Sequence, residues 1–259
     1  MKKFGDHFTA PEGKCPASGL FSFGHFFLLA LSFLGLRWAL NHTLALPYET
    51  LRQIIRVLAV VLLALEGIKI YFKRVKEHST SKYDSWIPLY YCSIAMYAAV
   101  LSGFGSGVWQ RMGDVFLAVG ALIGGICFLL YPSSSIMIYP WTHFLSLHSF
   151  FYHTTMTYLG ILVNRSGLLN LAWQHFPFYA AFFGFFCAIA YWLNRKYDLN
   201  LMFISKPFHG TFQDRVYKIV GKGFTAVLIL VQMIVPFVVI LLFKQYTLLL
   251  SRPSWYPAI

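Results

Sequence analysis

The chain has 259 residues, of which 58% are hydrophobic, 19% aromatic and only 12% charged. Soluble domains carry about 25% charged residues, so this composition excludes an ordinary soluble domain and indicates a membrane protein. The formal net charge of +12 does not indicate nucleic-acid binding, because the basic residues lie in loops and at helix ends between apolar blocks. In that position they act as topology signals and contact lipid headgroups.

The apolar residues fall in blocks of about twenty, the length that crosses about 30 Å of hydrocarbon. The sequence predicts an all-α, polytopic bundle of about seven transmembrane helices, at about 21–40, 52–72, 86–103, 113–130, 142–163, 171–193 and 222–243. We detect no internal repeat, which disfavours a transporter built from two related halves.

Three parts of the chain are distinguished by composition. Residues 1–20 form a polar cytoplasmic lead-in without the apolar core of a signal peptide, residues 21–245 form the transmembrane domain, and residues 246–259 form a polar and aromatic tail. Of the 21 Lys and Arg residues, 14 lie on the side of the membrane that holds the N-terminus. Basic residues are in excess on the cytoplasmic side, so we predict a cytoplasmic N-terminus.

The four cysteines show no CxxC pairing, and three of them, Cys92, Cys127 and Cys187, lie inside apolar blocks. The fourth, Cys15, belongs to the lead-in. This distribution predicts neither a disulfide framework nor a zinc site. We interpret Cys127 and Cys187 as packing residues, because cysteine behaves as a small hydrophobe in apolar surroundings.

Three histidines in the fifth block, His143, His148 and His153, are spaced by five residues. Metal ligands on one helix prefer a spacing of four, and a spacing of five turns the side chains about 140° beyond one full turn. A di-iron site needs several inward carboxylates, whereas Glu66 is the one acid deep in an apolar block. Since a Gly-rich phosphate loop is lacking as well, we expect no metal and no cofactor.

Four side chains that carry chemistry are predicted to share one depth. Ionisable residues within a span are costly and need an explanation. Cys92 and His148 each lie six residues after the start of a predicted span, which is about 9 Å at 1.5 Å per residue. Glu66 lies six residues before the end of a span that runs the other way, and His25 lies about one turn into the first span.

A thiol, two imidazoles and a carboxylate supply a nucleophile, a base and an orienting acid. A thiol in apolar surroundings is inert until a neighbouring imidazole takes its proton. We therefore select Cys92 as the candidate nucleophile and His148 as its base, with Glu66 and His25 as further catalytic candidates. Each has a simpler alternative: packing for Cys92, solvation at the membrane surface for His25, and for Glu66 an ion pair with a lysine at the end of its helix.

Four stretches carry a family resemblance: FSFGHFFLLALSFL around His25, WIPLYYCSI around Cys92, FLSLHSFFYHTTM around His148, and NLMFISKP at 200–207. In this order and spacing they resemble the YwaF-like bacterial integral membrane family. That family is similar to vertebrate transmembrane protein 164, a phospholipid acyltransferase, and more distantly to lipid hydrolases of the androgen-induced type. The resemblance covers about residues 20–245.

The resemblance implies a lipid-remodelling enzyme of the bacterial cytoplasmic membrane, with Cys92 and His148 as its functional pair. An acyl chain would pass from a phospholipid to the cysteine and on to a lysophospholipid without coenzyme A, or to water. One position departs from the pattern, since Tyr90 stands where the bacterial motif usually has a histidine. The basic loops at 73–82 and 195–222 are candidates for holding the lipid phosphate. A small transporter or a lipid-binding scaffold without chemistry is the alternative.

Overall fold

The computed structural model describes residues 7–75, 87–208 and 210–250, which are helical with connecting turns and contain no β-strand. The long helices are α2 (Phe23–Thr43), α3 (Tyr48–Val75), α7 (Phe144–Arg165), α8 (Phe176–Tyr197) and α10 (Phe224–Leu250). The shorter ones are α4 (Ile94–Phe104), α5 (Gly107–Phe116), the π-helix η1 (Leu117–Ala121), α6 (Leu122–Leu130), α9 (Phe212–Val220) and the single turns η2 (Trp173–His175), η3 (Leu201–Phe203) and η4 (Gly221–Gly223). The predicted all-α class is confirmed.

Four helical segments of the described chain are long and apolar enough to cross a membrane: Phe23–Thr43, Gly107–Leu130, Trp173–Tyr197 and Gln213–Tyr246. They contain or overlap the spans predicted at 21–40, 113–130, 171–193 and 222–243. Many large apolar side chains of α2 and α10 are exposed, as a surface in contact with lipid requires. These features identify an integral membrane protein with several membrane-crossing helices.

The other three predicted spans, at 52–72, 86–103 and 142–163, are either more polar or shorter than these four segments. Helices α3 and α7 have 28 and 22 residues, enough to cross a membrane, but they carry more polar and charged side chains. Helix α4 has 11 residues and is about 16 Å long, roughly half the apolar thickness of a bilayer. The total of seven transmembrane helices and the cytoplasmic N-terminus remain predictions.

The helix expected from residue 86 begins only at Ile94, and this corrects the sequence-based boundary. Pro88 has no backbone N–H and restricts the residue before it to extended conformations. The carbonyl oxygen of Leu89 accepts a hydrogen bond from the backbone nitrogen of Met202 at 3.1 Å, so it does not contribute to a helix. Cys92 therefore lies in the turn before α4 and not two turns inside a helix.

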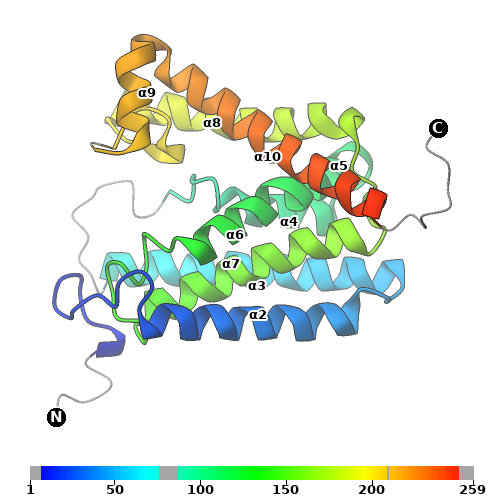
Figure 1. The fold of residues 1–259 in the computed structure, drawn as a ribbon, viewed down its shortest axis with the longest axis horizontal. Coiled ribbons are helices and arrows are strands. Elements are labelled where there is room, and N and C mark those ends of the chain that lie inside the picture. Colours follow the sequence, from blue (N-terminus) through cyan, green and yellow to red (C-terminus); the bar gives the residue numbers. More distant parts are fainter. Residues whose placement is uncertain (1–6, 76–86, 209, 251–259) are drawn as a thin grey trace.

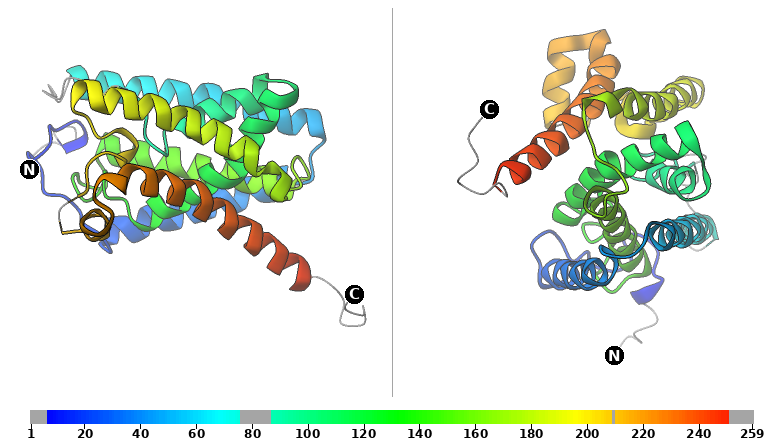
Figure 2. Two further views of the ribbon diagram at one scale, coloured as in Figure 1. Left: turned by 90° about the horizontal axis from the view of Figure 1, so that it is seen from above. Right: turned by 90° about the vertical axis from the view of Figure 1, so that its right-hand side faces the viewer.

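Helix α7 lies at the centre of the bundle. It contacts α2 and α3 on one side and α6 and η1 on the other, and Figure 1 shows it between these layers. Helix α8 packs on α5, and α10 crosses α8 obliquely in Figure 1, while Figure 2 shows α10 beside α8 on the outside of the bundle. The central position of α7 brings its polar residues among α2, α3 and α6.

Glycines allow α6 and α7 to pack closely. A Cβ atom on Gly125 would collide with Oγ1 of Thr157 and lie 2.8 Å from the carbonyl oxygen of His153. A Cβ atom on Gly160 would lie 2.6 Å from Cβ of Leu122. Small residues at helix interfaces let backbones approach in this way, so the glycines fix the register of α6 against the histidine-bearing helix.

A buried ion pair joins α3 to α5. Arg52 donates two hydrogen bonds to the carboxylate of Asp114, at 2.6 and 2.8 Å, and both side chains are almost completely buried. Ser102 of α4 donates a third hydrogen bond to the same carboxylate. A bidentate pair of this kind has a defined geometry, and it fixes three helices relative to one another.

Candidate functional site

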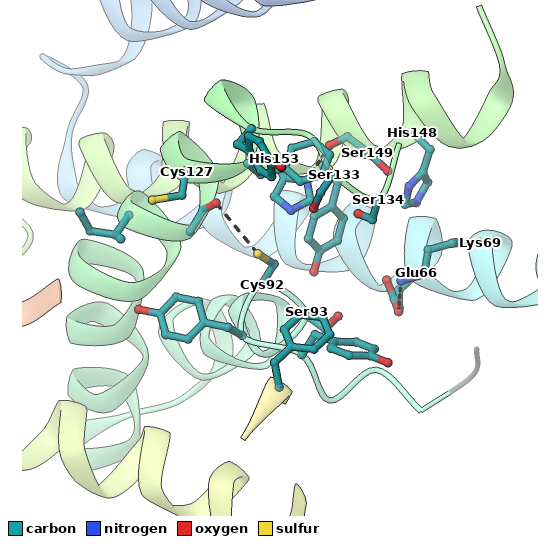
Figure 3. Close-up of a pocket in the computed structure, with 18 of the residues that line it drawn as sticks. Glu66, Lys69, Cys92, Ser93, Cys127, Ser133, Ser134, His148, Ser149 and His153 are labelled. Carbon is teal, nitrogen blue, oxygen red and sulfur yellow. Dashed lines mark hydrogen bonds and ion pairs between the residues drawn. The ribbon is translucent and has the colours of Figure 1, made fainter. Parts of the chain in front are cut away.

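A cavity of about 880 Å³ lies among α3, α6, α7 and the turn before α4. Three of the four predicted site residues, Glu66, Cys92 and His148, line it (Figure 3). Two residues that the sequence did not select for this role, Cys127 and His153, line it as well. Side chains from η3 and α10 also contribute to the wall, so the cavity is formed by elements from most of the chain.

The cavity combines an apolar lining with polar and charged groups. Its apolar part includes Ile123, Phe128 and Leu145. Figure 3 shows Glu66 and Lys69 on the same side as His148, while Cys127 lies on the opposite side with Cys92 between them. The arrangement suits a ligand that has both a polar head and an apolar chain.

Cys92 is held in place by contacts from α6 and from the 200–207 loop. Its Sγ lies 4.0 Å from the carbonyl oxygen of Gly124 in α6, the contact drawn as a dashed line in Figure 3. The rings of Tyr90 and Phe203 lie 5.0 Å apart, next to the hydrogen bond between the backbones of Leu89 and Met202. Two of the stretches that carry the family resemblance therefore meet in space.

The 200–207 loop is itself fixed by Asn194 of α8, which is 4% exposed. The side chain of Asn194 accepts a hydrogen bond from the backbone nitrogen of Leu201 at 2.7 Å and donates to the carbonyl oxygen of Leu201 at 3.0 Å. It also donates to the hydroxyl of Ser205 at 2.8 Å. Met202 adopts a left-handed conformation with φ of 57°, which is uncommon for a residue with a side chain. This anchoring positions the loop that supports the cysteine turn.

His148 has one nitrogen engaged and one without a partner. Its Nε2 donates to the carbonyl oxygen of Leu65 at 3.0 Å, which leaves the lone pair on Nδ1. That Nδ1 atom is covered by protein and has no hydrogen-bond partner among the described residues. The imidazole therefore has a defined tautomer, but its free nitrogen is closed off.

Glu66 does not orient His148. Its carboxylate pairs with the ammonium group of Lys69 at 2.6 Å, one turn further along α3. This is the simpler alternative that the sequence allowed for Glu66. The tautomer of His148 is set instead by the backbone carbonyl of Leu65, and the described residues show no hydrogen bond between Cys92 and His148.

His153 was not selected as a site residue, because the sequence presented it only as one of three evenly spaced histidines. Its Nδ1 donates to the carbonyl oxygen of Ser149 at 2.7 Å, which leaves the lone pair on Nε2. Its ring stacks on Phe128 with centroids 3.6 Å apart and an interplanar angle of 9°. The depth match between Cys92 and His148 assumed a helix at 87–93, which the structure does not contain, and it left His153 out of consideration.

His25 does not line the cavity. It is 1% exposed, its Nε2 bonds to the carbonyl oxygen of Leu129 at 3.0 Å, and its Nδ1 accepts from the backbone nitrogen of Phe21 at 3.2 Å. Both nitrogens are thus engaged: Nε2 joins the start of α2 to the end of α6, and Nδ1 binds the residue that precedes α2 by two positions. These contacts favour a role in packing over one in the chemistry of the cavity.

Comparison with known families gives one match. The TMEM164 family model matches residues 20–245, a range that includes every residue lining the cavity. No curated protein and no solved structure matches the chain. Because the family match extends over most of the sequence, the chain belongs to the TMEM164 family.

Proposed function

We propose that the protein is a membrane-embedded phospholipid acyltransferase that uses Cys92 as its nucleophile and needs no coenzyme A. The observation that supports this most is the placement of the Cys92 thiol in one lipid-sized cavity with imidazoles of α7 whose tautomers are fixed by backbone carbonyls. The proposed substrates are a diacyl phospholipid as donor and a lysophospholipid as acceptor.

The proposed reaction has two transfers. An imidazole of α7 takes the thiol proton, and Sγ of Cys92 attacks the ester carbonyl of the donor. A C–S bond forms, the ester C–O bond breaks, and the departing lysophospholipid oxygen receives the proton. The acceptor's hydroxyl then gives its proton to the imidazole and attacks the thioester, which restores the thiol. Covalent catalysis divides a difficult transfer into two easier steps.

The charges around the cavity support an anionic headgroup. Glu66 neutralises Lys69, whereas Lys73 has no acidic partner in the described part of the chain. The lining therefore keeps one positive charge for a phosphate diester, with hydroxyls from Ser133 and Ser134 as further donors. Of the predicted basic loops, residues 76–82 lie outside the described residues, and the loop at 195–222 remains a candidate for headgroup contact.

The proposal is tested with the purified protein in mixed micelles. We expect an acyl chain to move from a diacyl phospholipid to a lysophospholipid without coenzyme A, with some free fatty acid formed by hydrolysis of the thioester. Cys92→Ala should abolish both products, and Cys187→Ala should not, because Cys187 is buried and does not line the cavity. If no lipid class gives transfer or release, and Cys92→Ala fully complements a deletion strain, the protein acts as a scaffold or transporter instead.

A further inference from the structure

We infer that His153, rather than His148, takes the proton from Cys92. The inference rests on the proposed function and names the base of that reaction. Three observations carry it: which nitrogen holds the lone pair, whether that nitrogen is open to the cavity, and where each imidazole lies relative to the thiol.

The lone pair of His153 is available in the cavity. A carbonyl oxygen only accepts hydrogen bonds, so the bond to Ser149 places the ring proton on Nδ1 and leaves Nε2 basic. Nε2 has no partner in the described ranges and is not closed off as Nδ1 of His148 is. Since a base has to reach the proton that it removes, the open nitrogen is the better candidate.

His153 also lies beside the part of α6 that contacts the thiol. The Sγ atom of Cys92 lies next to the carbonyl oxygen of Gly124, and Phe128, one helical turn later, carries the stacked ring of His153. One turn advances about 5.4 Å, so the thiol and the imidazole contact successive turns of α6. The backbone of His153 is close by as well, because its carbonyl oxygen is what a Cβ atom on Gly125 would meet at 2.8 Å.

His148 is placed differently. It lies five residues earlier on α7, about 7.5 Å along the helix axis, and its ring is bonded to α3 through Leu65. Figure 3 shows it toward Glu66 and Lys69, whereas His153 lies on the side of the cavity where Cys92 and Cys127 are. We assign His148 to holding α7 against α3, which makes it a positioning residue.

Two matched variants separate the roles, because each keeps the existing hydrogen bond and removes the free nitrogen. Asparagine at 153 retains a donor near the position of Nδ1, and glutamine at 148 retains one near the position of Nε2. The measurement is the initial rate at which Cys92 becomes acylated by a fluorescent diacyl phospholipid in mixed micelles. His153→Asn should lower this rate by about 100-fold or more, the usual contribution of a general base, while His148→Gln retains most of it.

Chemical rescue adds a readout that a purely structural role would not give. His153→Ala should be as slow as His153→Asn, but added imidazole should restore part of its rate, because the space left by the side chain is continuous with the cavity. His148→Ala should show no such rescue. Size-exclusion profiles and thermal unfolding of each variant establish that it is folded.

Loss of acylation in His148→Gln with a normal rate in His153→Asn overturns the inference and leaves the proposed function standing. Equal loss in both variants, or no rescue of His153→Ala by imidazole, also overturns the assignment to His153. If instead the unmodified protein is not acylated, or is acylated equally after Cys92→Ala, the proposed function itself fails.

Discussion

The backbone nitrogen of Met202 donates a hydrogen bond of 3.1 Å to the carbonyl oxygen of Leu89, and this bond joins the 200–207 loop to the turn that carries Cys92. The two segments are more than 100 residues apart in the sequence. Residues 87–89 do not form a helix, so this bond to the loop is one of the contacts that position the turn. The catalytic geometry should therefore respond to changes in the loop's own anchor.

Asn194 is that anchor, and Asn194→Ala should reduce acyl transfer although the residue does not line the cavity. The variant removes three hydrogen bonds and leaves the backbone groups of Leu201 unsatisfied, at a cost of about 1–3 kcal/mol. The measurements are thermal unfolding and the rate of Cys92 acylation. Asn200→Ala serves as a comparison, because Asn200 binds the exposed end of the same loop. An unchanged acylation rate in Asn194→Ala would contradict a supporting role for the loop.

Thiol reactivity should distinguish the three cysteines of the helical domain. An acyl-type lipid probe should label Cys92 and not Cys127 or Cys187, because a thiol in apolar surroundings reacts only where a base removes its proton. Cys127 is the informative control, since it lines the same cavity as Cys92 and is more exposed. Mass spectrometry of the labelled protein gives the site. Equal labelling of Cys92 and Cys127 would show that access, and not activation, determines reactivity.

The helices that the sequence predicted well are those whose apolar residues form long uninterrupted blocks, such as α2 and α8. The predicted start of α4 was wrong because Pro88 stands inside an apolar block and was not read as a helix breaker. In addition, the hydrogen bond from Met202 to the segment before the turn comes from a distant part of the chain. The left-handed conformation of Met202 has no sequence signal, because it is a methionine and not a glycine.

The sequence predicted most of the candidate residues that line the cavity, but not which of them contact one another. Residue type and depth selected Cys92, Glu66 and His148, and all three line the cavity. The place of His153 in the cavity wall involves the stacking of its ring on Phe128, a contact between two helices that no local pattern shows. The partner of Glu66, in contrast, lies three residues away and was among the alternatives that the sequence allowed.

Removing one partner of the buried ion pair should destabilise the protein strongly. Asp114→Asn leaves the guanidinium of Arg52 buried without its counter-charge, and such changes cost about 3–5 kcal/mol. Asp198→Asn is the matched control, because the pair of Asp198 with Lys206 is exposed and contributes at most about 1 kcal/mol. Unfolding of both variants in the same detergent gives the difference. Similar stabilities would mean that the Arg52–Asp114 pair is not the connection between α3 and α5 that its geometry indicates.

Gly125→Ala should impair acyl transfer by separating two helices. The added methyl group would collide with the side chain of Thr157 and press on the backbone of His153, so α6 has to move away from α7. This movement displaces the carbonyl oxygen of Gly124 and the ring of Phe128, which contact Cys92 and His153. Overpacking of this kind typically costs about 1–3 kcal/mol, and we expect the acylation rate to fall with the melting temperature.

Gly35→Ala in α2 is the control, because its Cβ atom would meet no other atom within 4 Å, and alanine favours a helix. Gly125→Ala with normal stability and a normal rate of Cys92 acylation would show that the close contact between α6 and α7 is not what positions the thiol and the imidazole.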